Sequence, residues 1–132
     1  MLLAIKRRMT AGVAILDVIG PVTAGAEADA LRNHLMDALQ DASKYILLNC
    51  EQLTKADSSA LGEMMQAYSH IVKEGGMLKL LRPQPRLRHL LEMTNLDNIF
   101  EIHEDEGKAA ASFSSASAAK TQQTMNSFLK GQ

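Results

Sequence analysis

Residues 57–62 read DSSALG and place one carboxylate and two hydroxyl groups where an apolar run gives way to an amphipathic one. Asp and Ser favour the first turn of a helix, because their side-chain oxygens accept hydrogen bonds from its free N–H groups. That turn also carries partial positive charge and can hold an anion. Ser58 could therefore be a helix cap, a nucleophile or an acceptor of a phosphoryl group.

A nucleophilic serine needs a nearby base and a sharp turn that presents its hydroxyl group. Ser58 lies between Asp57 and Ser59 and lacks the Gly-x-Ser-x-Gly frame of the hydrolases. No histidine is close in sequence, although the fold could bring one of the four nearer: His34, His70, His89 and His103. Histidine and carboxylate residues also lack metal-ligand spacing such as His-x-x-x-His. We expect no enzymatic activity, no metal and no cofactor.

Length and composition limit the possible classes of protein. A chain of 132 residues fits one domain, and its net charge of −1 argues against nucleic acid as a direct partner. No apolar run approaches the roughly 18 to 20 residues of a membrane helix. The basic run at 6–8 is not followed by the apolar region of a signal peptide. The single cysteine, Cys50, lies in an apolar run and is expected to be buried. These features predict a cytoplasmic protein without membrane insertion.

Alternating apolar patterns predict the elements that must position residues 57–62. The runs 2–8 and 13–19, joined by Ala11 and Gly12, predict an antiparallel hairpin whose first strand is an edge strand. Further strands are expected at 45–50, 77–81 and 99–103. Apolar residues at helical spacing predict helices across 28–39, 61–72 and 87–94, and a fourth begins near Glu106. Thr23 is a candidate cap for the first of these helices.

The predicted order is β-β-α-β-α-β-α-β-α, which indicates the α/β class. Strands that alternate with helices form a mostly parallel sheet, here of about five strands with about four helices. We expect the domain to span residues 1–111. Residues 112–132 are rich in Ala, Ser, Thr and Gln and predict a flexible or frayed C-terminal tail.

Two segments resemble a known family. Residues 54–62, TKADSSALG, resemble the signature of STAS domains, in particular that of the bacterial anti-sigma-factor antagonists, whose pattern runs Asp-Ser-Ser/Thr-Gly-Leu-Gly. Residues 87–100, LRHLLEMTNLDNIF, resemble the helix, the Asn-Leu-Asp turn and the last strand of the family. The resemblance covers residues 2–113 and implies the STAS fold, whose order of elements is the one predicted above.

The resemblance implies a role for each residue of the motif. Ser58 corresponds to the serine that is phosphorylated in such antagonists, with Ser59 as the alternative. Asp57, Ser58, Ser59, Ala60 and Gly62 would form the surface that binds a partner. That partner would be both a serine kinase and an anti-sigma factor; it would bind the unphosphorylated protein and release a sigma factor. A PP2C-type phosphatase would reset the switch, and the protein itself would supply no catalytic group.

Two departures from the pattern leave another class of function open. Ala60 stands where the family has glycine, and Lys55 and Ala56 stand where it has larger apolar residues. The alternative is a STAS accessory subunit that docks constitutively, on a lipid-transport ATPase complex or a stress-signalling scaffold.

A basic group at Arg82, Arg86 and Arg88 is either a solvated surface or a contact for an anion or a partner.

Overall fold

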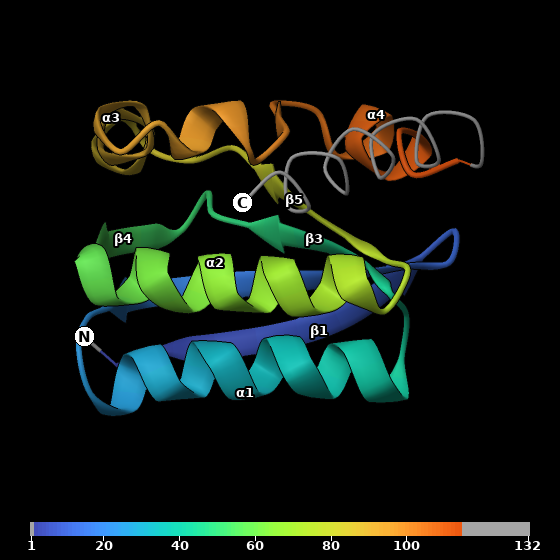
Figure 1. Cartoon of the computed structure of the whole chain (residues 1–132), viewed down its shortest axis with the longest axis horizontal. Helices are drawn as coiled ribbons and strands as arrows, with labels where there is room; N and C mark the ends of the chain where they lie inside the picture. Colours follow the sequence, from blue (N-terminus) through green and yellow to red (C-terminus); the bar gives the residue numbers. More distant parts are fainter. Residues whose placement is uncertain (1, 115–132) are drawn as a thin grey trace.

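A six-stranded mixed sheet with two helices against one of its faces organises the computed structural model, which describes residues 2–114 (Figure 1). The elements in chain order are β1 (Ala4–Thr10), β2 (Val13–Val22), α1 (Ala26–Asp41), β3 (Tyr45–Asn49), β4 (Leu53–Ala56), α2 (Ser58–Lys73), β5 (Met77–Leu81), α3 (Pro85–Met93), the short 3₁₀ helix η1 (Leu96–Asn98), β6 (Ile102–His103) and α4 (Glu106–Ala111).

The strands follow the order β1-β2-β3-β5-β6, and β4 pairs with the far end of β2. β1 and β2 are antiparallel, and every other pair is parallel. β2 pairs with β3 along Ala14–Asp17 and with β4 from Gly20 onward, and a register shift between Gly20 and Pro21 interrupts the pairing with β4. The predicted α/β class and the mostly parallel sheet are confirmed.

The turn between β1 and β2 is a tight hairpin. Ala11 and Gly12 both have positive φ angles, 51° and 80°. Two consecutive residues with positive φ make the type I′ geometry, whose twist matches that of the flanking strands. The turn closes on the pair Thr10 and Val13. The predicted hairpin and the edge position of β1 are therefore confirmed.

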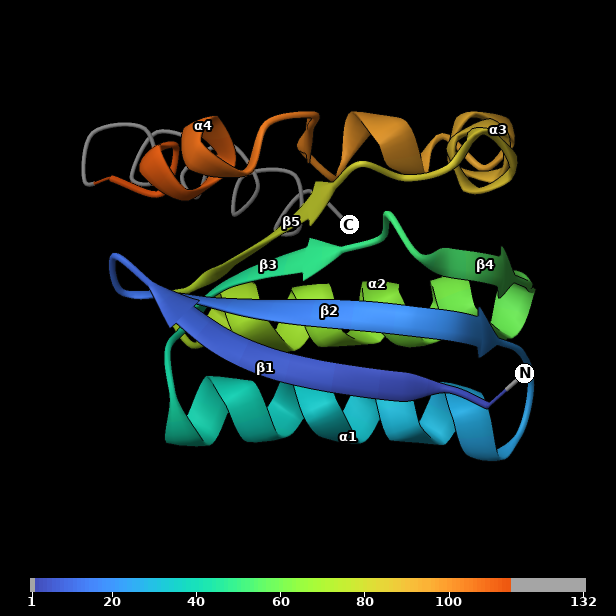
Figure 2. The same cartoon turned by 180° about the vertical axis from the view of Figure 1, so that it is seen from behind.

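The core lies mainly between the sheet and the pair α1 and α2, which lie on the same face of it in the two opposite views (Figures 1 and 2). Each helix buries one apolar stripe, including Leu31 and Leu35 in α1 and Met64 and Ile71 in α2. α3 packs against β4, and α4 against β5 and β6. Cys50 is buried as expected, and burial raises the pKa of its thiol to about 12.

The opposite face of β5 holds a buried cation. Lys79 has 0% of its surface exposed. Its ammonium group donates to the Ser112 carbonyl and hydroxyl oxygens (3.1 and 2.8 Å) and pairs with Glu101 (2.8 Å). It also lies 4.6 Å from the centre of the Phe113 ring, within cation–π range. We call Lys79, Glu101, Ser112 and Phe113 the Lys79 cluster; it joins the centre of the sheet to the end of α4.

Several elements differ from the sequence prediction. β4 was not predicted, and the predicted strand at 99–103 shortens to Ile102–His103. Phe100 packs instead edge-on against Tyr68 of α2, with ring centres 5.2 Å apart. Thr23 does not cap α1, because the N-cap is Gly25 and no side chain bonds to it; Thr23 bonds to Glu27.

Packing continues past the predicted domain boundary at residue 111. Ser112 belongs to the Lys79 cluster, and Phe113 is buried against Tyr45. Residues 115–132, which make up most of the predicted tail, lie outside the described residues. Within residues 2–114, no helix combines the length and apolar character that a membrane crossing requires.

Candidate functional site at the start of helix α2

Asp57 turns the chain from β4 into α2. Its backbone is extended (φ −108°, ψ −173°), as an N-cap residue requires, and Ser58 is the first helical residue. One carboxylate oxygen, Oδ1, accepts a hydrogen bond from the backbone N–H of Ala60 at 3.1 Å. The other, Oδ2, accepts from the backbone N–H of Ala24 at 3.0 Å. Asp57 thus caps its own helix and holds the loop that precedes α1.

These bonds keep Asp57 ionised. The hydrogen bond from the Ala60 N–H does most to lower the pKa of Asp57, and the bond from Ala24 adds to it. Partial burial opposes ionisation but does not prevail, so the pKa lies below its usual range. The start of α2 therefore carries a fixed negative charge at neutral pH.

Ser58 is exposed and Ser59 is half-buried. Within residues 2–114, neither hydroxyl group has a hydrogen-bond partner, and none of the four histidines bonds to Ser58. The cap is therefore Asp57, and the hydroxyl group of Ser58 is left free at the positive end of the helix. The sequence had left the capping role open between these two residues.

The other predicted site residues differ in their exposure to solvent. Ala60 has 0% of its surface exposed, so its methyl group lies beneath the surface. Gly62 is exposed, and a Cβ placed on it would meet no atom within 4 Å. Asp57, Ser58, Ser59 and Gly62 are therefore accessible from outside the molecule, whereas the side chain of Ala60 is not.

The loop before α1 belongs to the same surface and was missed by the sequence analysis. α1 and α2 begin at the same end of the molecule (Figure 1), and Ala24 and Gly25 are exposed beside Asp57. Glu27 accepts two hydrogen bonds from Thr23, at 2.9 and 2.7 Å, and the bond from the Thr23 hydroxyl group does most to lower the pKa of Glu27. The loop could not be found from spacing, because its bond to Asp57 joins positions 33 residues apart.

A serine, a histidine and a carboxylate do meet elsewhere in the fold. The Ser112 hydroxyl group lies 3.4 Å from Nε2 of His103, and a Glu101 oxygen lies 2.5 Å from the same nitrogen. A catalytic relay uses the two ring nitrogens for the two partners. Since both partners here contact Nε2, these three residues do not form a triad.

The basic group around α3 is mostly engaged within the protein. Arg82 donates to the Glu104 carbonyl oxygen at 2.7 Å and pairs with Glu51 at 3.3 Å. Arg88 pairs with the Glu104 carboxylate. Arg86 is exposed and forms no ion pair within the described part of the chain. Arg82 and Arg88 therefore tie the segments around α3 and β6 together.

Comparison with known proteins identifies the class. The model of the STAS domain family matches residues 4–109, and the chain belongs to this family. A relative, the anti-sigma F factor antagonist of Paenibacillus polymyxa, is 30% identical over 83 residues, which cover 62% of this chain and 71% of the relative. This relative places the chain among the anti-sigma-factor antagonists of the family, and the resemblance found in residues 54–62 and 87–100 is confirmed.

Solved structures share the fold. An anti-sigma factor antagonist from Mycobacterium paratuberculosis has a TM-score of 0.73 at 19% identity, covering 84% of this chain and 93% of its own. The Bacillus cell fate determinant SpoIIAA, in its phosphorylated form, has a TM-score of 0.64 at 23% identity, covering 80% and 96%. SpoIIAA has also been solved in its unphosphorylated form, with a TM-score of 0.61 at 21% identity, covering 82% and 94%.

Proposed function

We propose that this protein is a phosphorylation-switched antagonist whose switch is Ser58. In its unphosphorylated form it binds a kinase-type anti-sigma factor in the cytoplasm, which frees a sigma factor. Phosphorylation of Ser58 by that partner ends the binding, and a PP2C-type phosphatase restores it. Asp57, Ser59 and Gly62 belong to the docking surface, and Ala60 shapes it from beneath.

The observation that carries the proposal is that Asp57 caps the helix while Ser58 does not. Asp57 accepts the helix N–H bond, so the exposed hydroxyl group of Ser58 can be modified without loss of the cap. The likeness to SpoIIAA, which is known in a phosphorylated and an unphosphorylated form, is consistent with a switch of this kind.

Electrostatics gives the switch its strength. A phosphate adds roughly −1.5 to −2 charges at neutral pH. The free protein would tolerate it, because the start of a helix is favourable for an anion. In a docked complex the phosphate would lose water beside the ionised Asp57. Two like charges 4 Å apart repel by about 1 kcal/mol in water and about 4 kcal/mol near a protein surface. Each 1.4 kcal/mol corresponds to about tenfold in affinity, so one modification suffices to release a partner.

The test is phosphoryl transfer from ATP with a kinase-type anti-sigma factor of the source organism. We expect one phosphate per chain, mapped to Ser58 by mass spectrometry. Ser59→Ala is the matched control, because it removes the neighbouring hydroxyl group of the same turn and should still be modified. Full modification of Ser58→Ala would show that the assigned serine is wrong.

A binding measurement distinguishes the switch from constitutive docking. Ser58→Asp should weaken binding of the anti-sigma factor at least tenfold, whereas Ser58→Ala should bind like the unmodified protein. If the isolated partner is instead a subunit of a lipid-transport ATPase or a signalling scaffold, and Ser58→Asp binds it unchanged, the accessory-subunit function is the correct one.

A further inference from the structure

The free edge of β1 is a second surface on which another chain could bind. β1 pairs with β2 along all seven of its residues and has no neighbour on its other side among the described residues. The opposite edge of the sheet, β6, is two residues long. A long free edge presents unpaired N–H and C=O groups that another strand can pair with.

The hairpin register identifies the backbone groups that face outward. In a two-residue hairpin the closing pair, here Thr10 and Val13, is hydrogen-bonded, and hydrogen-bonded pairs then alternate along the ladder. Counting back from Thr10, we infer that Ile5, Arg7 and Met9 direct their N–H and C=O groups away from β2. Arg7 lies at the centre of this free edge.

The side chains along the edge are cationic, and they are not equally engaged. Arg8 bonds to Asp17 at 2.7 Å and to Glu106 at 2.6 Å. Lys6 is exposed and has no ion pair within residues 2–114. The carboxylate of Asp17, directly across the ladder from Lys6, is occupied by Arg8 and by Asn49 at 2.8 Å. Lys6 acts on Asp17 only through its charge and forms no ion pair with it, so its ammonium group can pair with an outside anion.

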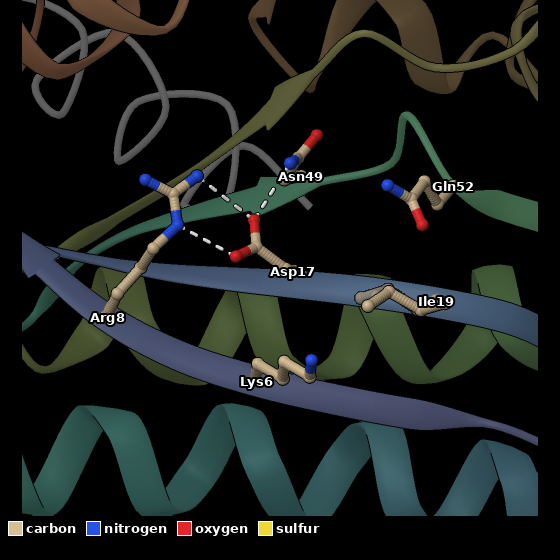
Figure 3. A pocket seen from close by; sticks show the side chains of 7 residues that line it. Lys6, Arg8, Asp17, Ile19, Asn49 and Gln52 are labelled. Carbon is tan, nitrogen blue, oxygen red and sulfur yellow. Dashed lines mark hydrogen bonds and ion pairs between the residues drawn. The ribbon is translucent and has the colours of Figure 1, made fainter.

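Lys6 lies on the open face of the sheet beside a shallow cavity. Figure 3 shows its side chain along one side of the cavity, with Ile19 and Gln52 beyond Asp17. The cavity measures about 290 Å³ and is bounded by β1, β2 and the segment around Asn49. An acidic side chain on an added strand could reach the Lys6 ammonium group from this face without displacing any protein group.

The other face of β1 is less suited to an acidic side chain. There Arg7 and Ile5 line a hollow of about 260 Å³ with Asp37 and Asp41 of α1. With two carboxylates to one arginine, this face would repel a further acid, whereas the two carboxylates on the Lys6 face, Asp17 and Glu106, are both paired with Arg8. Specificity for an acidic residue therefore belongs to the Lys6 side of the strand.

Pairing of β1 with β1 of a second copy is disfavoured. An antiparallel pair centred on Arg7 would place Arg7 opposite Arg7 and Lys6 opposite Arg8. Like charges directly opposite each other destabilise a strand pair, and cationic edges are one way in which proteins avoid self-association. The occupant that fits this edge carries the opposite charge.

We propose that the β1 edge binds an extended segment of another protein, which adds as a strand and places an Asp or Glu side chain against Lys6. Main-chain hydrogen bonds to Ile5, Arg7 and Met9 supply affinity, and the ion pair at Lys6 selects the segment. The proposal is independent of Ser58, because the two surfaces share no residue.

The test is titration of the ¹⁵N-labelled protein with two synthetic peptides that differ in one residue, Ac-TVTETVT-NH₂ and Ac-TVTKTVT-NH₂, followed by NMR. We expect saturable shifts confined to residues 3–10 with the Glu peptide, and binding at least about tenfold weaker with the Lys peptide, because attraction to Lys6 becomes repulsion. Absence of saturable shifts, or shifts centred elsewhere, would overturn the proposal.

Matched variants separate the contribution of the ion pair at Lys6 from that of the main-chain hydrogen bonds of β1. Lys6→Glu should weaken binding of the Glu peptide about tenfold, whereas Lys55→Glu, the same change at an exposed lysine of β4, should not. Arg7→Pro removes an outward N–H, whereas Arg7→Ala keeps it. Of these two variants, only Arg7→Pro should lose binding, and its NMR spectrum checks that it is folded. Equal binding by all four variants, or equal competition by a DNA oligonucleotide, would leave nonspecific attraction as the explanation and refute strand addition.

Discussion

The start of α2 and the Lys79 cluster hold charged groups by opposite means. Asp57 is held by backbone N–H groups at the surface, in a loop-to-helix turn. Lys79 is held in the interior by side chains and a carbonyl oxygen; both groups have a partner 33 residues away, but Lys79 binds side chains from two further segments. The first arrangement depends on few neighbours, whereas the second connects β5, the segment before β6 and the end of α4.

This difference indicates where the charge can change without disturbing the packing of the fold and where it cannot. A phosphate at Ser58 alters charge at an exposed turn and leaves the packing of the sheet untouched. A change at Lys79 removes a fully buried charge and the side chain that fills the space between β5 and the end of α4, although its partner Glu101 stays partly open to water. A switch is therefore better placed at the start of α2 than anywhere in the Lys79 cluster.

The largest expected effect is at Lys79. Lys79→Ala should lower the free energy of unfolding by about 3 kcal/mol or more, because it leaves a cavity and unpaired polar groups beneath α4. Urea unfolding at pH 7 measures it, with Lys55→Ala at an exposed site as the control. A loss below about 1 kcal/mol would show that the cluster is no more than a surface ion pair.

The next effect is at Asp57. Asp57→Ala should cost about 1 kcal/mol of stability, which is typical for loss of a helix N-cap. Asp57→Asn should recover part of this loss, because its amide oxygen still accepts from the Ala60 N–H, whereas its NH₂ group cannot accept from the Ala24 N–H. If Asp57→Ala proved as costly as Lys79→Ala in the same urea series, the distinction between the two regions would fail.

A smaller effect concerns pH. The hydrogen bonds to Asp57 lower its pKa; burial opposes ionisation of Glu101, but its bonds from Lys79 and His103 prevail and lower its pKa as well. A carboxylate with a depressed pKa stabilises the fold above its unfolded pKa, about 4, and this stability is lost as pH falls through the folded value. The urea concentration at the unfolding midpoint, measured from pH 6 to pH 2.5, should decrease once the pH is below about 4. This decrease should be less steep in Asp57→Asn and in Glu101→Gln. Unchanged slopes in both variants would contradict this assignment.

The smallest effect is expected at Ser58. Because Asp57 is the cap and the Ser58 hydroxyl group has no partner in the described residues, Ser58→Ala should change stability by less than about 0.5 kcal/mol. Thermal and urea unfolding can both measure this. A loss near that of Asp57→Ala would mean that Ser58 contributes to the cap and is not free for modification.

Local signals in the sequence were sufficient for most elements and for the position of Ser58. The apolar runs and helical periods predicted the order of the main elements, and the motif placed Ser58 at a helix start. β4 escaped notice because Leu53 is its one fully buried residue and Thr54 and Lys55 are exposed, so it lacks the apolar pattern of a strand. Its identity as a strand depends on irregular pairing with the end of β2, which is a property of the assembled sheet.

The remaining features depend on contacts between distant positions. Lys79 sits in the middle of an apolar strand, and its partners at Glu101 and Ser112 are 22 and 33 positions further along. No spacing rule links these residues. The loop at Ala24 was missed for the same reason, since only the folded chain brings it to Asp57.

The two hydrogen bonds of Asp57 also differ in when they can form as the chain folds. The bond from Ala60 spans three residues and can close as soon as the first turn of α2 exists. The bond from Ala24 spans 33 residues and needs β2, α1 and β4 in place. The same carboxylate thus accepts one hydrogen bond that can form early in folding and one that can form only late. Glycine keeps both N–H donors, so a Gly substitution loosens the turn or the loop without removing its bond. In kinetic experiments, Ala60→Gly should slow folding more, relative to its cost in stability, than Ala24→Gly.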